Sequence, residues 1–170
     1  MGILIPSFQG IPMNRLTDFR LPTIEGGTLS LSDIQQRPAT LLVFYKASCD
    51  TSVYALKLLN DFGRRRTSSD PLIYLISQDP PGETEAFIRR ESLRLPVAVD
   101  YPEYRLSRQL DFRSVPAWYL VDGQGNIPGR SEGFVRTEVE HLLEELFRKN
   151  GQDLPPIFAD PESVPALRPG

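Results

Sequence analysis

The segment ATLLVFYKASCDTSVYALKLLNDFG, residues 39–63, decides the fold of this chain. Residues 39–47 form an unbroken run rich in apolar and β-forming side chains, which is typical of a strand buried on both faces. From Asp50 onward the pattern changes to helical spacing, with apolar side chains at Val53, Leu56, Leu59 and Phe62. The sequence therefore predicts a central strand followed by a helix, with Cys49 at the junction between them.

Apolar runs and helical patterns continue to alternate after this segment. The expected strands are 72–77, 96–99, 115–122 and 126–134, and the expected helices are 83–93, 102–110 and 137–147. The last two strands are joined by a Gly-containing turn at 122–125, which is typical of a hairpin. A hairpin late in a β-α-β chain implies a mixed sheet, so the expected fold class is α/β.

Two sequence pairs have the form of a capping box, in which a Ser or Thr is followed three residues later by Glu or Gln. They are Ser32 with Gln35 and Thr137 with Glu140. Each pair predicts the start of a helix.

The composition is that of one ordinary folded domain. The chain has 170 residues, of which 40% are hydrophobic and 24% charged, and this length can bury a core without disulfides. Nineteen Lys and Arg against 22 Asp and Glu give a formal net charge of -3, without the basic excess that nucleic-acid binding needs. One cysteine and one histidine cannot build a zinc site of the usual kind. We therefore expect no nucleic-acid partner, no metal and no other cofactor.

The sequence shows no membrane span and no export signal. No apolar run reaches about 18 residues, the length that a spanning helix requires. The first residues, MGILIPSFQGIP, lack the basic start and long apolar centre of a signal peptide. We expect a cytoplasmic protein without a membrane partner, although a leader already removed would leave no trace.

We expect three regions along the chain. Residues 1–15 mix apolar side chains with prolines and form an N-terminal arm, and residues 16–149 form the domain. Residues 150–170 contain five prolines and no hydrophobic period, so we expect this tail to be extended or disordered.

Two motifs carry a resemblance to a known family. FYKASCDTS at residues 44–52 resembles the active-site segment of thioredoxin-like proteins, F-[WYF]-x-x-x-C-x-x-C, and SVPAWYLVDGQGNI at residues 114–127 resembles their V-P-T-x-[FY]-L-[IV]-D-x-x-G segment. The elements between them resemble the unit inserted in the redoxin and TlpA-like branch. The resemblance covers residues 16–149. It implies a thioredoxin-like three-layer α/β/α sandwich with a central mixed sheet, and thiol-disulfide oxidoreductase activity.

Cys49 is the candidate nucleophile. A cysteine directly before a helix meets the free N–H groups of the first turn and the positive end of the helix dipole, and both favour the thiolate. A free cysteine can also be a small buried hydrophobe without reactivity. Tyr45 and Lys46 are candidates for modulating the acidity of the thiol, through a hydrogen bond or a positive charge.

Ser52 departs from the dithiol pattern of the family, which has a second, resolving cysteine at this place. A hydroxyl cannot displace sulfur from a mixed disulfide, so turnover would need an external thiol such as glutathione. Ser52 could still donate a hydrogen bond to the Cys49 sulfur, or be an ordinary polar residue of the first helical turn. The resemblance thus implies a monothiol oxidoreductase that acts on protein or small-molecule disulfides.

Val115 and Pro116 are the candidate substrate groove. In the family that the chain resembles, the peptide bond before this proline is cis and the proline packs against the active-site cysteine. A cis bond exposes the backbone of the preceding residue as a short strand edge, to which an extended substrate can pair. A trans proline that opens a strand is the alternative.

Three other interpretations stay open. The chain could be a thioredoxin-like binding module that has lost redox turnover, or Ser52 could be an engineered replacement of a native cysteine. A one-cysteine peroxidase is the third, but Lys46 replaces the proline of the usual F-Y-P-x-x-x-T-x-x-C pattern, and Cys49 does not stand at the place of its cysteine. Such an enzyme would have to use Cys49 differently.

Overall fold

Seven consecutive buried residues place β3 (Ala39–Tyr45) at the centre of the sheet. In the computed structural model, which describes residues 14–170, β3 pairs in parallel with β4 (Ile73–Ser77) and antiparallel with β6 (Ala117–Asp122). The sheet has the order β5-β4-β3-β6-β7, with the outer strands β5 (Val97–Val99) and β7 (Gly129–Glu132). The prediction of an α/β fold with a central mixed sheet is confirmed.

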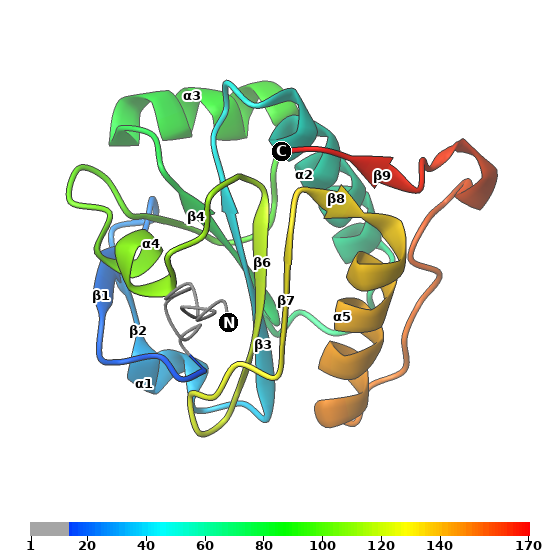
Figure 1. The fold of residues 1–170 in the computed structure, drawn as a ribbon, viewed down its shortest axis with the longest axis horizontal. Helices are drawn as coiled ribbons and strands as arrows, with labels where there is room; N and C mark the ends of the chain where they lie inside the picture. Colours follow the sequence, from blue (N-terminus) through cyan, green and yellow to red (C-terminus); the bar gives the residue numbers. More distant parts are fainter. Residues whose placement is uncertain (1–13) are drawn as a thin grey trace, which may run out of the picture.

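Helices cover both faces of this sheet (Figure 1). Alternate residues of a strand point to opposite faces, so Leu41 and Val43 enter one core, and Leu42 and Phe44 the other. The first core is closed by three helices, α2 (Asp50–Arg64), α3 (Pro81–Glu91) and α5 (Arg136–Lys149). The second is closed by the hairpin of β1 (Arg20–Pro22) and β2 (Thr28–Ser30), with α1 (Leu31–Ile34) and α4 (Arg105–Leu110).

Both predicted capping boxes are wrong. The cap of α1 is Ser30, whose hydroxyl accepts a hydrogen bond from the Asp33 N–H while the Asp33 carboxylate accepts one from the Ser30 N–H. The strand before α1 ends at Ser30 and the helix begins at Leu31, so Ser32 lies inside the helix. The helix α5 begins at Arg136, directly after β8 (Phe134–Val135), and has no side-chain cap. It is held instead by its predicted stripe of buried apolar residues.

The N-terminal arm predicted over residues 1–15 lies outside the described residues except for its end. Arg15 forms an isolated β-bridge with Asn126, and the Leu16 N–H donates to the Gly125 carbonyl at 2.8 Å. Throughout residues 14–170, every helix is too short or too polar to cross a lipid bilayer.

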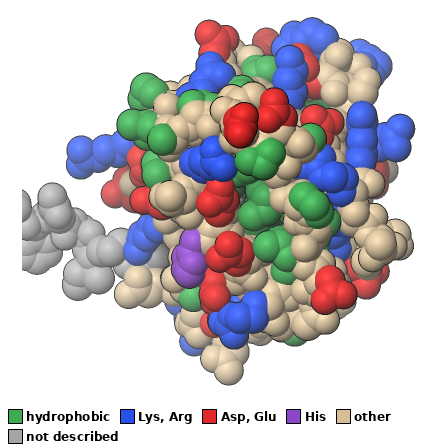
Figure 2. Space-filling view, turned by 90° about the vertical axis from the view of Figure 1, so that its right-hand side faces the viewer, with side chains coloured by type: hydrophobic (Ala, Val, Ile, Leu, Met, Phe, Trp, Pro, Cys, Tyr) green, Lys and Arg blue, Asp and Glu red, His purple; other side chains and the backbone are tan. Residues whose placement is uncertain are grey.

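Residues 150–170, predicted to be extended or disordered, are packed on the domain. The tail follows α5 and α2 along one side of the molecule and returns to the end where α2 begins (Figure 1). Phe158 and Val164 are buried in the first core. Figure 2 shows this side of the molecule, where side chains of both charges surround small apolar areas.

Arginine side chains explain why a proline-rich segment is ordered here. Arg65 donates to the carbonyls of Pro156 and Ile157 at 3.0 and 2.7 Å, and Arg136 donates to those of Pro161 and Val164 at 2.7 and 3.1 Å. These guanidinium groups satisfy carbonyls of an irregular segment, of which that of Pro161 also accepts the Val164 N–H that closes a 3₁₀ turn. The tail ends with η1 (Pro161–Ser163), a single 3₁₀ turn, and β9 (Leu167–Arg168), which pairs with β8.

Candidate active site

Cys49 is the N-cap residue of α2 and is partly exposed. Its backbone is extended, with φ -95° and ψ 113°, and its sulfur accepts a hydrogen bond from the Ser52 N–H at 3.4 Å. The thiol in turn donates to the Val115 carbonyl at 3.4 Å. The sulfur therefore takes the place of the oxygen of an ordinary Ser or Asp cap, and it touches Val115, which precedes β6 and lies 66 residues further along the chain.

The turn before Cys49 is held by a carboxylate from the next strand. The Ala47 N–H donates to Asp79 Oδ2 at 2.7 Å, and the Cys49 N–H closes the turn by donating to the Lys46 carbonyl at 3.1 Å. Asp79 follows β4, the parallel neighbour of β3. Because the carboxyl ends of parallel strands meet at one edge of a sheet, this topology could have pointed to Asp79, which the sequence reasoning missed.

The Val115–Pro116 peptide bond is cis, the geometry that the resemblance implied. Pro116 is buried and Val115 is partly exposed, and the Val115 carbonyl is the one that the Cys49 thiol contacts. Behind it, the Pro116 carbonyl accepts a hydrogen bond from the Gly133 N–H at 2.8 Å, where β7 leads into β8. The structure thus brings Cys49 together with Val115 and Pro116.

Ser52 lies beneath this site, but its hydroxyl does not reach the sulfur. The residue is fully buried, and its Oγ has no hydrogen-bond partner among residues 14–170. Only the backbone N–H of Ser52 contacts Cys49. A buried hydroxyl without a partner costs about 1–3 kcal/mol. The side chain occupies an enclosed space without contributing a bond.

Tyr45 and Lys46, the two candidates for modulating the thiol, differ in burial. Tyr45 is fully buried, and its ring packs on Phe87 with centroids 5.4 Å apart. Burial raises the pKa of Tyr45 to about 12, so the phenol stays protonated at neutral pH. Lys46 is exposed. Within the described part of the chain, neither side chain hydrogen-bonds to Cys49.

The tail reaches this site as well, which the sequence reasoning did not anticipate. Thr51 Oγ1 donates to the Pro169 carbonyl at 2.6 Å, and Gly170 lies against the Val115 carbonyl. No local pattern signals a contact between residues 118 positions apart.

Part of the sequence is similar to a known protein family. A family model described as the AhpC/TSA family matches residues 12–129. No curated protein has a sequence that matches this chain.

Solved structures give the same fold. A candidate thiol:disulfide interchange protein DsbE from Chlorobium tepidum is 21% identical with a TM-score of 0.69, covering 81% of this chain and 96% of its own. The exposed lipoprotein thioredoxin of Streptococcus pneumoniae is 23% identical with a TM-score of 0.61, covering 76% and 99%. The peroxidoxin BcpB of Mycobacterium tuberculosis is 16% identical with a TM-score of 0.65, covering 78% and 94%. These likenesses confirm the predicted thioredoxin-like fold.

Proposed function

This chain belongs to the AhpC/TSA family, and we propose that it is a monothiol thiol-disulfide oxidoreductase that reacts through Cys49, its only cysteine. The observation that carries the proposal is the position of the Cys49 sulfur. It accepts the Ser52 N–H at the start of α2 and touches the backbone of Val115 beside the cis bond to Pro116.

The first step is the attack of the Cys49 thiolate on a disulfide. A bond forms between the Cys49 sulfur and the nearer sulfur of the substrate, while the disulfide bond of the substrate breaks. The second substrate sulfur leaves as a thiolate and takes a proton from solvent. The Ser52 N–H holds the attacking sulfur in place, and the helix dipole of α2 stabilises its negative charge.

The second step needs a thiol from outside the chain. Ser52 has an oxygen where a resolving sulfur would be required, and an alcohol does not displace a thiolate from a mixed disulfide. A low-molecular-weight thiol such as glutathione attacks the mixed disulfide, forms a new disulfide with the substrate and releases Cys49 as the thiolate. The partners are then protein or small-molecule disulfides together with this external thiol.

Neighbouring residues supply binding and charge in this proposal. Val115, partly exposed at the cis bond, offers its backbone edge to an extended substrate, and Pro116 forms the buried wall behind it. Lys46 is exposed three residues before Cys49 and brings a positive charge to the segment that precedes the sulfur. Tyr45 acts through packing, because its buried phenol stays neutral.

The test of the first step is the rate at which a small disulfide labels the protein. Intact-mass measurement after addition of oxidised glutathione should show one adduct, formed at neutral pH faster than with free cysteine. The Cys49→Ser variant, the control, should show none. A wild-type protein that stays unlabelled on the time scale of free cysteine would overturn the proposal and leave the binding module as the function.

A one-cysteine peroxidase is a second candidate, favoured by the family match and by the likeness to a peroxidoxin. In that reaction the Cys49 thiolate would attack a peroxide oxygen, become a sulfenic acid and release water or an alcohol. Trapping with dimedone after addition of hydrogen peroxide distinguishes the two reactions. The oxidoreductase predicts slow trapping and fast disulfide exchange, and a peroxidase predicts the reverse.

The cytoplasmic location favoured by the sequence stays a prediction, and it suits the proposal because a reduced thiol pool is present there. Fractionation of cells that carry the native gene, followed by detection of the protein in each fraction, tests it.

A further inference from the structure

Residues 168–170 lie on the groove beside Cys49. The Pro169 carbonyl accepts a hydrogen bond of 2.6 Å from Thr51 Oγ1, in the first turn of α2. Gly170 is so close to Val115 that a Cβ added to it would stand 2.4 Å from the Val115 carbonyl oxygen. This is the same oxygen that the Cys49 thiol contacts at 3.4 Å.

Two further contacts fix the direction of the segment. The Arg168 guanidinium stacks on the Tyr54 ring of α2, 4.4 Å from its centroid. Leu167 and Arg168 form β9, which pairs antiparallel with Val135 and Phe134 of β8. The chain therefore approaches the groove in extended form, within a two-stranded sheet of β8 and β9 that is separate from the central sheet.

Gly133 makes this approach sterically allowed. Its φ is +70°, and a Cβ at this position would stand 3.1 Å from the Arg168 carbonyl oxygen and 3.1 Å from the Gly170 nitrogen. A side chain at residue 133 would thus press on the tail. The groove has a glycine where the tail crosses it.

We propose that residues 166–170 act as a built-in occupant of the substrate groove and lower the reactivity of Cys49 toward extended disulfide substrates until they move away. The proposal rests on the oxidoreductase function proposed above. The segment and an extended substrate exclude each other because Gly170 stands against the Val115 carbonyl, which is part of the backbone edge that the substrate needs.

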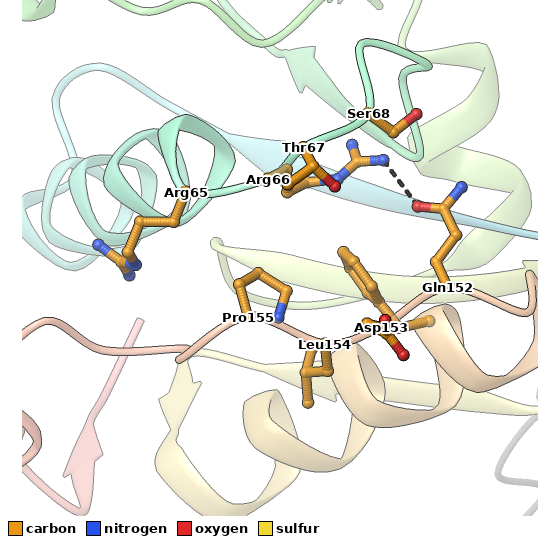
Figure 3. A pocket seen from close by; sticks show the side chains of 9 residues that line it. Arg65, Arg66, Thr67, Ser68, Gln152, Asp153, Leu154 and Pro155 are labelled. Carbon is orange, nitrogen blue, oxygen red and sulfur yellow. Dashed lines mark hydrogen bonds between the residues drawn. The ribbon is translucent and has the colours of Figure 1, made fainter.

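The way in which the tail is held shows which part can move. The first part of the tail is anchored by the buried Phe158 and by Arg65. Arg66 also donates to Gln152 across a cavity of about 400 Å³ (Figure 3). The last residues have no such anchor, since Leu167 is 61% exposed. They are held by polar contacts and one cation–π contact only, which is typical of a segment that opens locally.

The test compares the full chain with a variant that lacks residues 166–170. The substrate is an extended peptide carrying a mixed disulfide, and the readout is the rate of adduct formation at Cys49 by intact mass. An occupant that is bound about nine-tenths of the time lowers about tenfold the fraction of molecules whose groove is free for substrate. Deletion should therefore raise the rate of adduct formation by about that factor. The rate with oxidised glutathione should rise less, because a small disulfide needs less of the groove.

A point variant keeps the test decisive if the deletion disturbs folding. Arg168→Ala removes the contact with Tyr54 and should raise the peptide rate about two- to fivefold, the change expected for one exposed cation–π contact. Its matched control is Arg148→Ala, an exposed arginine of α5 that pairs with Glu145 away from the groove, and this variant should leave the rate unchanged.

The outcomes separate the two proposals. Equal peptide rates in the full chain, the deletion variant and Arg168→Ala would overturn the built-in occupant while the oxidoreductase function stands. A deletion variant that stays folded by circular dichroism and forms no adduct with either disulfide would overturn the oxidoreductase function itself.

Discussion

Residues 39–63 and residues 150–170 contact each other in the fold, but different interactions order them. The first segment is a strand with seven buried residues and a helix with its own backbone hydrogen bonds. The second has little regular structure and depends on Phe158, Val164 and arginine donors from other elements. A segment without hydrophobic periodicity can thus be ordered by partners that are distant in sequence. Such a segment unfolds locally more easily than a buried strand and its helix.

The largest effect should come from the first segment. Leu56 is fully buried in α2, and Leu56→Ala should lower the free energy of unfolding by about 2–5 kcal/mol, because it removes apolar contacts and leaves a cavity. Urea unfolding followed by circular dichroism measures the change. A loss smaller than that caused by Phe158→Ala would contradict the greater contribution of the first segment to stability.

Alkaline pH should destabilise the same segment. Burial raises the pKa of Tyr45 from 10.0 to about 12. Above pH 10 the unfolded chain releases this proton while the folded chain keeps it, so the free energy of unfolding falls as pH rises. The total decrease is about 2.7 kcal/mol once both forms are ionised. Tyr45→Phe has no phenol to ionise, so its free energy of unfolding should rise relative to that of the wild type between pH 9 and 12. A difference independent of pH would show that Tyr45 ionises normally in the folded state.

Phe158→Ala tests the second segment and should have a smaller effect. We expect a loss of about 2 kcal/mol, below the 3–5 kcal/mol usual for a buried phenylalanine, because the tail can detach while the sheet stays folded. Hydrogen exchange should show faster exchange in residues 150–170 and unchanged rates in β3. Equal acceleration in both segments would mean that they unfold as one unit.

The smallest effect concerns two serines that are both fully buried. Ser52 Oγ has no hydrogen-bond partner in the described chain, so Ser52→Ala should raise the unfolding free energy by about 1 kcal/mol. Ser77 Oγ is hydrogen-bonded to Thr84 Oγ1 at 2.7 Å, and Ser77→Ala should lower it by a similar amount. Thermal unfolding measures the change in stability of both variants. Changes of the same sign in the two variants would contradict the hydrogen-bond assignment of Ser52.

The parts of the fold that could be predicted are those with a local pattern. The buried run at 39–45 and the stripe of α5 follow from periodicity, and the meeting of Cys49 with Val115 follows from the two motifs of the resemblance. The cap at Ser30 could not be told from Ser32, because a serine at either position can begin a helix and only the end of β2 decides between them.

The rest depended on contacts between distant residues. The order of the tail comes from Phe158 and Arg65, which are far apart in sequence and have no period. The bond from Thr51 to Pro169 exists only once the tail is packed. Asp79 was within reach of topological reasoning, since it follows the parallel neighbour of β3.

The most direct measurement of the central claim is the lifetime of the mixed disulfide at Cys49. After labelling with a small disulfide and removal of the excess, intact mass is followed with and without added glutathione, in wild type and in Ser52→Cys. The account predicts that the wild-type adduct persists until glutathione is added, whereas the Ser52→Cys adduct resolves without it into an internal disulfide. A wild-type adduct that disappears without any added thiol would contradict the account.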